Sequence, residues 1–299
     1  MFANMSAQLV MQQIFNGLAI GMAYALVAVG FSLVFGILRL INFAHGAVYA
    51  LAAYIALIFI GLNFGIMTAM LMAVVLSGLV GIVIDKTALQ PLRKKKSPPI
   101  AILITTVGMG RVIQDLLVAS FGSQMRPFPR MFDFGMVEFS GLRIPSTQLV
   151  LFFVSLVMMV AITVLIRGTK IGLGMRAVEQ NTKASHLMGV NVNQIISFTF
   201  FLAGASAAIA SGLIASHYQI VSPQMSAMVG MKAFAAAVLG GVGSLPGAVV
   251  GGLIVGVSET LASTFFGDVY SETTAFIVLF IMLIIRPTGL FGKEEVVKV

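Results

Sequence analysis

Long apolar runs separated by short polar segments make up most of the chain. Eight runs occur, at about residues 8–38, 43–62, 64–88, 99–121, 147–166, 195–221, 226–262 and 273–290. A helix needs about 20 apolar residues to cross the hydrocarbon core of a bilayer, and the runs have this length or more. They are continuously apolar and do not alternate, which predicts spanning helices and argues against a transmembrane β-barrel. We therefore expect an all-α, polytopic membrane helix bundle of about eight spans.

The composition agrees with this class. Hydrophobic residues make up 59% of the 299 residues and charged residues only 9%, whereas a soluble domain has roughly 25% charged residues. We expect residues 1–299 to form a single transmembrane domain. The first 38 residues contain no Lys or Arg, so the basic start of a signal peptide is missing and the first run is predicted to be a retained span. The chain has no Cys, which excludes disulfides and thiolate sites.

Basic residues gather in two polar segments. The first reads DKTALQPLRKKKSPP, residues 85–99, and the second covers about residues 167–194. A net charge of +8 would suggest a nucleic-acid partner in a soluble protein. In a membrane protein the enrichment of Lys and Arg in cytoplasmic loops explains it, so no nucleic acid is expected. Both segments are predicted to be cytoplasmic, and the nearly balanced loop between them, about 122–146, to be outside.

Counting spans from these segments orients the chain. The N-terminus is predicted to be outside, and the tail with Arg286, Lys293 and Lys298 to be cytoplasmic. The run 226–262 must then begin and end on the outer side. Its middle, LGGVGSLPGAVVGG, contains glycines and a proline that break a helix. We expect a Gly/Pro-broken helical hairpin or re-entrant pair there, and a tight turn between two full spans is the alternative.

Small residues predict close packing of the helices. The sequences GLAIG, GAVVG and GLIVG place glycines one helical turn apart, and this spacing lets helix backbones approach each other. No period of repeated sequence stands out, which leaves an older duplication open.

The polar segment 167–194 has the pattern of a cytoplasmic helix. The predicted features, in order, are a break at Gly172 and Gly174, a helix from Arg176 to Met188, a stop at Gly189 and a cap for the next span at Asn191. Such a helix can lie on the lipid surface or insert into a groove of a partner. Its apolar stripe is narrow and poor in aromatic residues, so we favour docking to a partner.

Residues for catalysis are sparse. The three His lie in three different segments, none with metal-ligand spacing, and the glycine-rich stretch of the 226–262 run lacks the GK[ST] of a P-loop. We expect no catalytic residue, no metal site, no cofactor and no ATP hydrolysis by this chain.

Ionisable and polar residues inside spans are candidates for function. Arg111 and Asp115 lie four residues apart and are predicted to pair on one helix face. Lys232 and Glu259 could pair with each other, snorkel outward or meet a zwitterionic substrate. The residues in INFAHG could line a gate or cap a helix. The candidate pathway or gate residues are Asn42, His45, Lys232, Ser244 and Glu259.

A known family matches three blocks of this sequence. The blocks are NGLAIGMAYALVAVGFSLVFGILRLINFAHGAVYALAAYIA, MRAVEQNTKASHLMGVNVNQI and MSAMVGMKAFAAAVLGGVGSLPGAVVGGLIVGVSE. In this order, and over nearly the full length of the chain, they resemble the LivH-type permease of branched-chain amino-acid ABC importers. The resemblance implies a bacterial inner-membrane protein that pairs with a second related permease subunit. It also implies two cytoplasmic ATPase subunits and a periplasmic substrate-binding protein as partners.

The resemblance gives the polar segment a role as the coupling helix that docks in a cleft of the ATPase. Glu179, Ala184 and Gly189 look like a degenerate form of the family's EAA-then-Gly pattern, and Arg176 begins the same predicted helix. The strict triplet is missing, since Gln180 and Asn181 follow Glu179.

Two other transport functions stay open at this point. Similar permeases carry leucine, isoleucine and valine, other amino acids, urea or small aromatic compounds, so an importer of urea or another short amide is one alternative. An ion-coupled secondary transporter is another, for which only Asp115 and Glu259 would be available as intramembrane carboxylates. A membrane-embedded enzyme would need a constellation that the sequence does not show.

Overall fold

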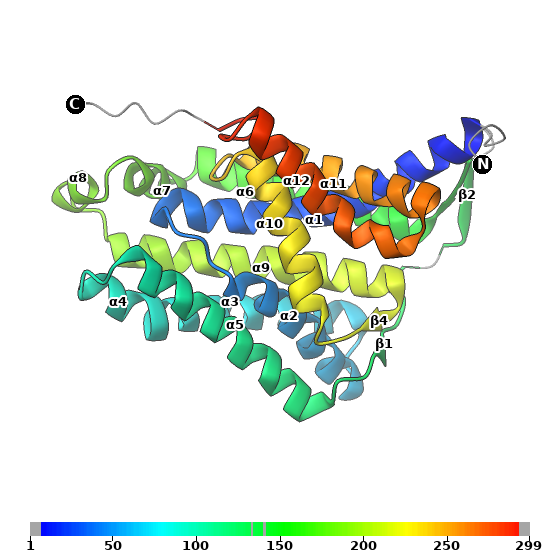
Figure 1. Ribbon diagram of the computed structural model, residues 1–299. Helices are drawn as coiled ribbons and strands as arrows, with labels where there is room; N and C mark the ends of the chain where they lie inside the picture. Colours follow the sequence, from blue (N-terminus) through cyan, green and yellow to red (C-terminus); the bar gives the residue numbers. More distant parts are fainter. Residues whose placement is uncertain (1–6, 133, 140–141, 293–299) are drawn as a thin grey trace.

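The computed structural model describes residues 7–132, 134–139 and 142–292 (Figure 1). The helices are α1 (Ala7–Leu38), α2 (Ala44–Gly61), α3 (Ile66–Ile84), the π-helix η2 (Asp85–Leu89), α4 (Gln90–Lys94), α5 (Pro99–Phe121), α6 (Ser146–Gly168), α7 (Lys170–Gln180), α8 (Thr182–Leu187), α9 (Val192–Tyr218), α10 (Met225–Gly240), α11 (Leu245–Phe266) and α12 (Asp268–Ile285). Lys293, Lys298 and the residues before Ala7 lie outside the described ranges, so the sides on which the two termini lie stay predictions.

Helices of spanning length dominate the described residues. Eight helical segments are long and apolar enough to cross a membrane, and α10, with 16 residues, is shorter. The only strands in the described ranges form two small antiparallel pairs: β1 (Arg126–Pro127) with β4 (Ile220–Val221), and β2 (Met136–Phe139) with β3 (Leu142–Pro145). The predicted all-α, polytopic bundle is confirmed.

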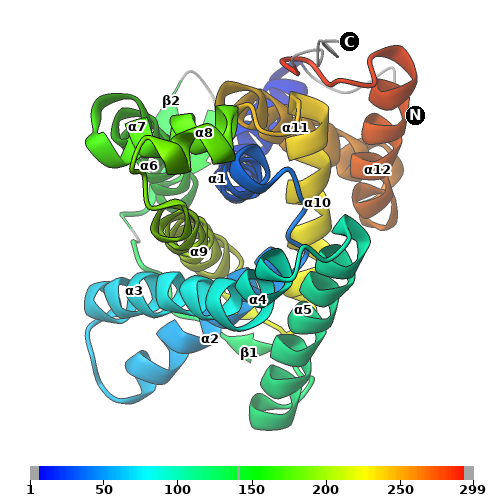
Figure 2. The ribbon, with the colours of Figure 1, turned by 90° about the vertical axis from the view of Figure 1, so that its left-hand side faces the viewer.

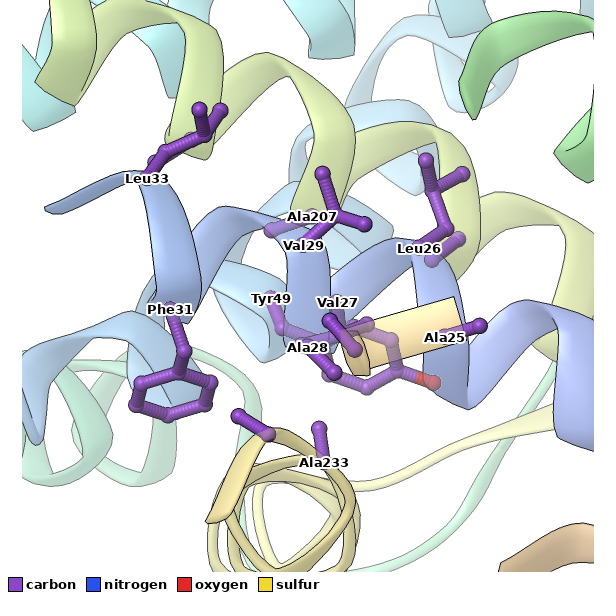
Figure 3. Packing of buried hydrophobic residues seen from close by; sticks show 14 of the residues in the cluster. Ala25, Leu26, Val27, Ala28, Val29, Phe31, Leu33, Tyr49, Ala207 and Ala233 are labelled. Carbon is purple, nitrogen blue, oxygen red and sulfur yellow. The ribbon is translucent and has the colours of Figure 1, made fainter. Parts of the chain in front are cut away.

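The first helix forms the centre of the bundle. Figure 2 shows α1 surrounded by α6, α9, α10 and α11, and these helices all contact it. The most apolar 18-residue window of α1 is 89% buried, whereas that of α12 is 6% buried, so α12 lies at the periphery. Figure 3 shows the packing around residues 25–33 of α1, with Ala207 of α9 and Ala233 of α10 nearby. The predicted glycine contacts are present, because Gly17 and Gly21 of α1 face the backbone of α11.

The two ends of the bundle differ in chemistry. In Figure 1, α4, α7 and α8 lie at the left end, which we call the basic end because it carries both basic segments. The four strands lie at the opposite end, which we call the strand end. The predicted outer loop, about 122–146, therefore lies across the bundle from both basic segments. The run predicted to end near residue 88 continues as a helix through η2 and α4 to Lys94.

Two sets of helices pack in the same pattern. In one set α2 contacts α3 and α5, and in the other α10 contacts α11 and α12. The first set also includes α1 and the second includes α9, and each of these two helices packs on the other set. Thus α1 contacts α10 and α11, and α9 makes the equivalent contacts with α2 and α3. Both α1 and α9 end at a residue with left-handed backbone, Arg39 (φ 54°) and Gln219 (φ 59°). Because α1 and α9 run in opposite directions (Figure 1), the two sets form inverted structural repeats.

The repeats meet where α2 crosses α10. After each left-handed residue the chain runs back into the bundle before the next helix starts, so α2 and α10 both begin within it (Figure 1). At the crossing, a Cβ added to Gly46 would collide with the carbonyl oxygen of Ser226 and lie 3.0 Å from the Cα of Gly230. A glycine is therefore required for this approach of the two backbones.

The chain breaks inside the run 226–262, as residues 241–244 separate α10 from α11. The two helices pack antiparallel, with Gly240 against Gly247 and Ala236 against Gly251. The segment after α12 covers this turn, since the N–H groups of Leu290 and Phe291 donate to the carbonyl oxygens of Leu239 and Gly240. Whether the pair crosses the bilayer fully or re-enters it stays a prediction.

Candidate functional site: the coupling segment and the repeat interface

The polar segment at the basic end folds as two short helices. The predicted break at Gly172 and Gly174 is wrong, because both lie inside α7 and the chain bends at Thr169, whose hydroxyl accepts from the Gly172 N–H at 3.0 Å. Gly172 serves a close approach, since an added Cβ would strike the backbone of Ile166 at the end of α6. Gly172 is therefore structurally important, as predicted, but for the packing of α7 on α6 and not for a break in the helix.

A second difference from prediction lies at Asn181. One helix was expected from Arg176 to Met188, but Asn181 is extended (φ −158°) and separates α7 from α8. Its Oδ1 accepts from the Ala184 N–H at 2.9 Å, which caps α8. The predicted stop is confirmed, because Gly189 follows α8 with φ 83°. The predicted cap at Asn191 is also confirmed, as its Oδ1 accepts from the Gln194 N–H at 3.2 Å.

The four predicted coupling residues do not share one surface. Arg176 and Glu179 of α7 line a small cavity of about 60 Å³ beside the end of α1 and the turn between α10 and α11. The Glu179 carboxyl group lies 3.7 Å from the position of a Cβ added to Gly36. Ala184 and Gly189 are instead exposed at the tip of the segment. The segment thus has one side toward the bundle and one toward solvent.

Two large apolar side chains at the tip are almost fully exposed. Leu187 is 86% and Met188 84% accessible, at the end of α8. Beside them an open groove of about 560 Å³ is lined by Thr182, Lys183, His186, Leu187, Val192 and Asn193. Met188 is the last residue of the helix predicted from the sequence, whereas Leu187 was not predicted to have a role. The exposure of Leu187 can be predicted only once the break at Asn181 is known, because this break separates α8 from α7.

An ion pair lies inside the bundle between α10 and α11. Lys232 Nζ is 2.7 Å from Glu259 Oε1, and the two side chains are 10% and 12% exposed. The ammonium group also lies 5.8 Å from the centroid of the Tyr24 ring of α1. Glu259 Oε2 has no hydrogen-bond partner among the described residues. Of the roles left open by the sequence, the structure shows pairing.

Asn42 and His45 are buried at the start of α2, near the crossing with α10. Asn42 Oδ1 accepts from the Ala44 N–H at 3.2 Å, so it caps the first turn. His45 Nε2 lies 3.2 Å from the Val27 carbonyl oxygen of α1. Its ring meets Phe31 edge-on at 4.7 Å, and Phe234 of α10 lies 6.0 Å from Phe31.

The remaining candidates fall elsewhere. Ser244 caps α11, accepting from the Gly247 N–H at 3.2 Å, and sits in the turn near Glu179, away from the Lys232 pair. The predicted pair of Arg111 and Asp115 is confirmed at 3.0 Å. The described residues contain no group of three or more His, Asp or Glu that could hold a metal ion.

The fold and these features define a class first: a polytopic membrane protein with inverted repeats and an exposed polar segment at one end, as in transport proteins. Residues 13–286 match the family model described as the branched-chain amino acid transport system / permease component. The chain belongs to this family.

Named relatives agree with the family match. The high-affinity branched-chain amino acid transport system permease protein LivH of Salmonella typhimurium is 36% identical over 97% of each chain. The corresponding protein BraD of Pseudomonas aeruginosa is 37% identical over 97% of this chain and 98% of its own. A probable branched-chain amino acid transport permease protein LivH of Methanocaldococcus jannaschii is 30% identical over 90% of this chain.

Proposed function

We propose that the chain is the transmembrane permease subunit of an ATP-driven importer for branched-chain or related amino acids. Family membership and the printed functions of its relatives support the substrate class. The observation in this structure that favours an ATP-driven importer is the pair of exposed apolar side chains, Leu187 and Met188, on a polar segment at the basic end. A transporter driven from a separate subunit needs such a docking element outside the membrane.

The proposed orientation puts the basic end in the cytoplasm. The positive-inside rule favours it for both basic segments, which lie at the same end. The N-terminus would then be outside, the C-terminus cytoplasmic and the strand end on the periplasmic side. In this arrangement α7 and α8 face two cytoplasmic ATPase subunits, and the strand end faces a periplasmic substrate-binding protein. A second related permease subunit would complete the translocation pathway.

We assign different tasks to the two sides of the coupling segment. Leu187, Met188, Ala184 and Gly189 would contact the ATPase, because they are exposed at the tip. Arg176 and Glu179 would pass the movement inward, because they lie against the end of α1 and the turn after α10. Closure of the ATPases would then shift the position of this turn and change which side of the permease is open.

The pathway is proposed to pass the interface between the repeats. Transporters with inverted repeats place their substrate site near mid-membrane at this interface. Asn42 and His45 lie at the crossing of α2 and α10, and Lys232 and Glu259 hold α10 to α11. Ser244 sits in the turn that the coupling segment touches. Asp115 and Glu259, the two carboxylates that the sequence placed inside spans, are both ion-paired, which favours an ATP-driven importer over an ion-coupled carrier.

The coupling assignment is tested with Leu187→Ser and Met188→Ser together. Buried apolar contacts at the centre of an interface contribute about 1–2 kcal/mol each, so ATPase binding should weaken tenfold or more. Binding is measured by co-purification, and uptake in vesicles should fall with it. Val269→Ser is the matched control, since Val269 is 85% exposed at the strand end. Unchanged ATPase binding in the double variant would refute the docking role.

The substrate class needs its own test. The binding protein that co-purifies with the permease is isolated and its bound ligand identified by mass spectrometry. Leucine, isoleucine or valine is the expected ligand, and urea or another short amide would refute the substrate assignment without affecting the docking assignment.

A further inference from the structure

An open groove lies at the basic end between the end of α3 and the start of α9, beyond the short helices α7 and α8. Its volume is about 500 Å³, and it is lined by Ile82, Lys86, Gln90, Asn191, Asn193, Gln194, Ser197 and Phe198. None of the residues assigned above to docking or to the pathway lines it, although Asn193 borders both this groove and the one beside Leu187.

Both walls of the groove change from apolar to polar in the same direction. On the wall formed by α3, η2 and α4, successive turns carry Ile82, Lys86 and Gln90. On the α9 wall, Phe198 lies one turn deeper in the bundle than Gln194. Such a gradient matches the boundary between the hydrocarbon core and the headgroup layer of a bilayer.

The groove keeps a positive charge. Among the described residues, the carboxylate at its edge is that of Asp85, which is neutralised by Arg93, whose Nη2 is 2.6 Å from Asp85 Oδ1. The Ser197 hydroxyl donates to Asp85 Oδ2 at 2.7 Å. Lys86 makes no ion pair with any residue in the described ranges, and its side chain is exposed. The amide groups of Gln90, Asn193 and Gln194 add hydrogen-bond donors without negative charge.

An exposed apolar surface leads away from the groove along the membrane. Val75, Leu79 and Val83 follow one another on α3 at four-residue intervals, and all three are exposed. Lipid chains would therefore continue from the groove along α3, which a free phosphate ion could not use.

We propose that this groove binds the headgroup of an anionic phospholipid. The phosphodiester oxygens would accept from Lys86 and the neighbouring amides, and the acyl chains would lie along Phe198, Ile82 and the apolar stripe of α3. Lys86 would make charge-assisted hydrogen bonds to the phosphodiester, which a lysine outside the groove cannot make. The bound lipid would join η2 to the first turns of α9, directly after the coupling segment.

The chain contains no Trp, so Phe198→Trp introduces a single tryptophan into the groove, which can be excited at a wavelength that the Tyr residues do not absorb. The full-length variant is reconstituted in phosphatidylcholine vesicles that contain increasing fractions of brominated phosphatidylglycerol or brominated phosphatidylcholine, and quenching of the tryptophan is measured. Phosphatidylglycerol should quench at lower mole fraction. Adding Lys86→Gln should reduce this preference about tenfold through loss of the direct contact, whereas Lys95→Gln, which removes an exposed charge from the same basic segment outside the groove, should change it much less.

Several results would overturn the proposal. Equal quenching by the two lipids would show that the groove does not recognise a negative headgroup. Equal effects of the Lys86 and Lys95 changes would show only general attraction to the surface. Loss of the preference in inorganic phosphate, but not in chloride of the same ionic strength, would make the groove a phosphate site. The quenching is also measured in the complex with the ATPase subunits, after the fluorescence of the same complex with the tryptophan-free parent is subtracted. Loss of the preference for phosphatidylglycerol there would show that the ATPase covers the groove.

Discussion

Lys232 and Glu259 bring a positive and a negative charge together inside the bundle. Their 2.7 Å contact leaves Glu259 Oε2 without a partner among the described residues. A buried ion pair contributes little net stability compared with apolar residues of similar size, but loss of one partner leaves an uncompensated charge. Removal of either charge alone should therefore destabilise the packing of α10 against α11.

Glu259→Gln should lower the free energy of unfolding by about 3 kcal/mol, because Lys232 is then buried without its counter-ion. Lys232→Met with Glu259→Gln should restore most of this loss. Thermal unfolding of Glu259→Gln, of Lys232→Met alone and of the double variant, in the same detergent as the parent, gives the coupling between the residues. If the double variant is as unstable as the sum of the two single ones, the charges do not interact energetically.

Gly46 is the residue on which the crossing of the repeats depends. Gly46→Ala should destabilise the protein by about 1–3 kcal/mol and reduce uptake, because the new methyl group meets the backbone of α10. Gly61→Ala in the same helix is the control, since nothing lies within 4 Å of its added Cβ. Thermal unfolding and vesicle uptake are measured for both. Equal behaviour of the two variants would mean that α2 and α10 can separate at no cost.

At the scale of elements, the coupling segment depends on one residue between two short helices. α8 has only 6 residues, and isolated helices of this length are not stable in water. The Asn181 cap and the turn at Gly189 therefore hold α8 in the form that exposes Leu187 and Met188.

Asn181→Ala should free the Ala184 N–H and destabilise α8 by about 1 kcal/mol. Hydrogen exchange of the α8 amides should then be faster, and ATPase binding weaker, while the spanning helices keep their protection. Asn181→Ser retains a side-chain oxygen and should behave like the parent. If exchange in α8 is equal in all three proteins, the cap does not stabilise this helix.

At the scale of the whole molecule, the two ends should be distinguishable from the two sides of the membrane. The chain has no Cys, so Leu187→Cys and Phe134→Cys can each be introduced alone, and both side chains are exposed. A thiol reagent that does not cross the membrane should label Phe134→Cys from outside in intact cells, and Leu187→Cys only in inverted vesicles. The opposite pattern would reverse the proposed orientation.

The sequence was sufficient for the bundle, its spans and the position of its basic end, because each follows from apolar length and charge alone. It also located the glycines, the cap at Asn191 and the pair of Arg111 and Asp115. It missed the break at Asn181, because the modest helix penalty of one Asn does not by itself distinguish a cap from an interior position. The inverted repeats were not visible either, because contacts between distant helices require only similar packing surfaces and not similar residues.

The short α10 has a consequence for the electrical properties of the protein. Its 16 residues extend about 24 Å, less than the roughly 30 Å of a hydrocarbon core, and it crosses the bundle obliquely (Figure 1). The helix alone is therefore too short to cross the core. Lys232 and Glu259 carry opposite charges inside the bundle, so a membrane potential pulls them in opposite directions and their relative position should respond to it.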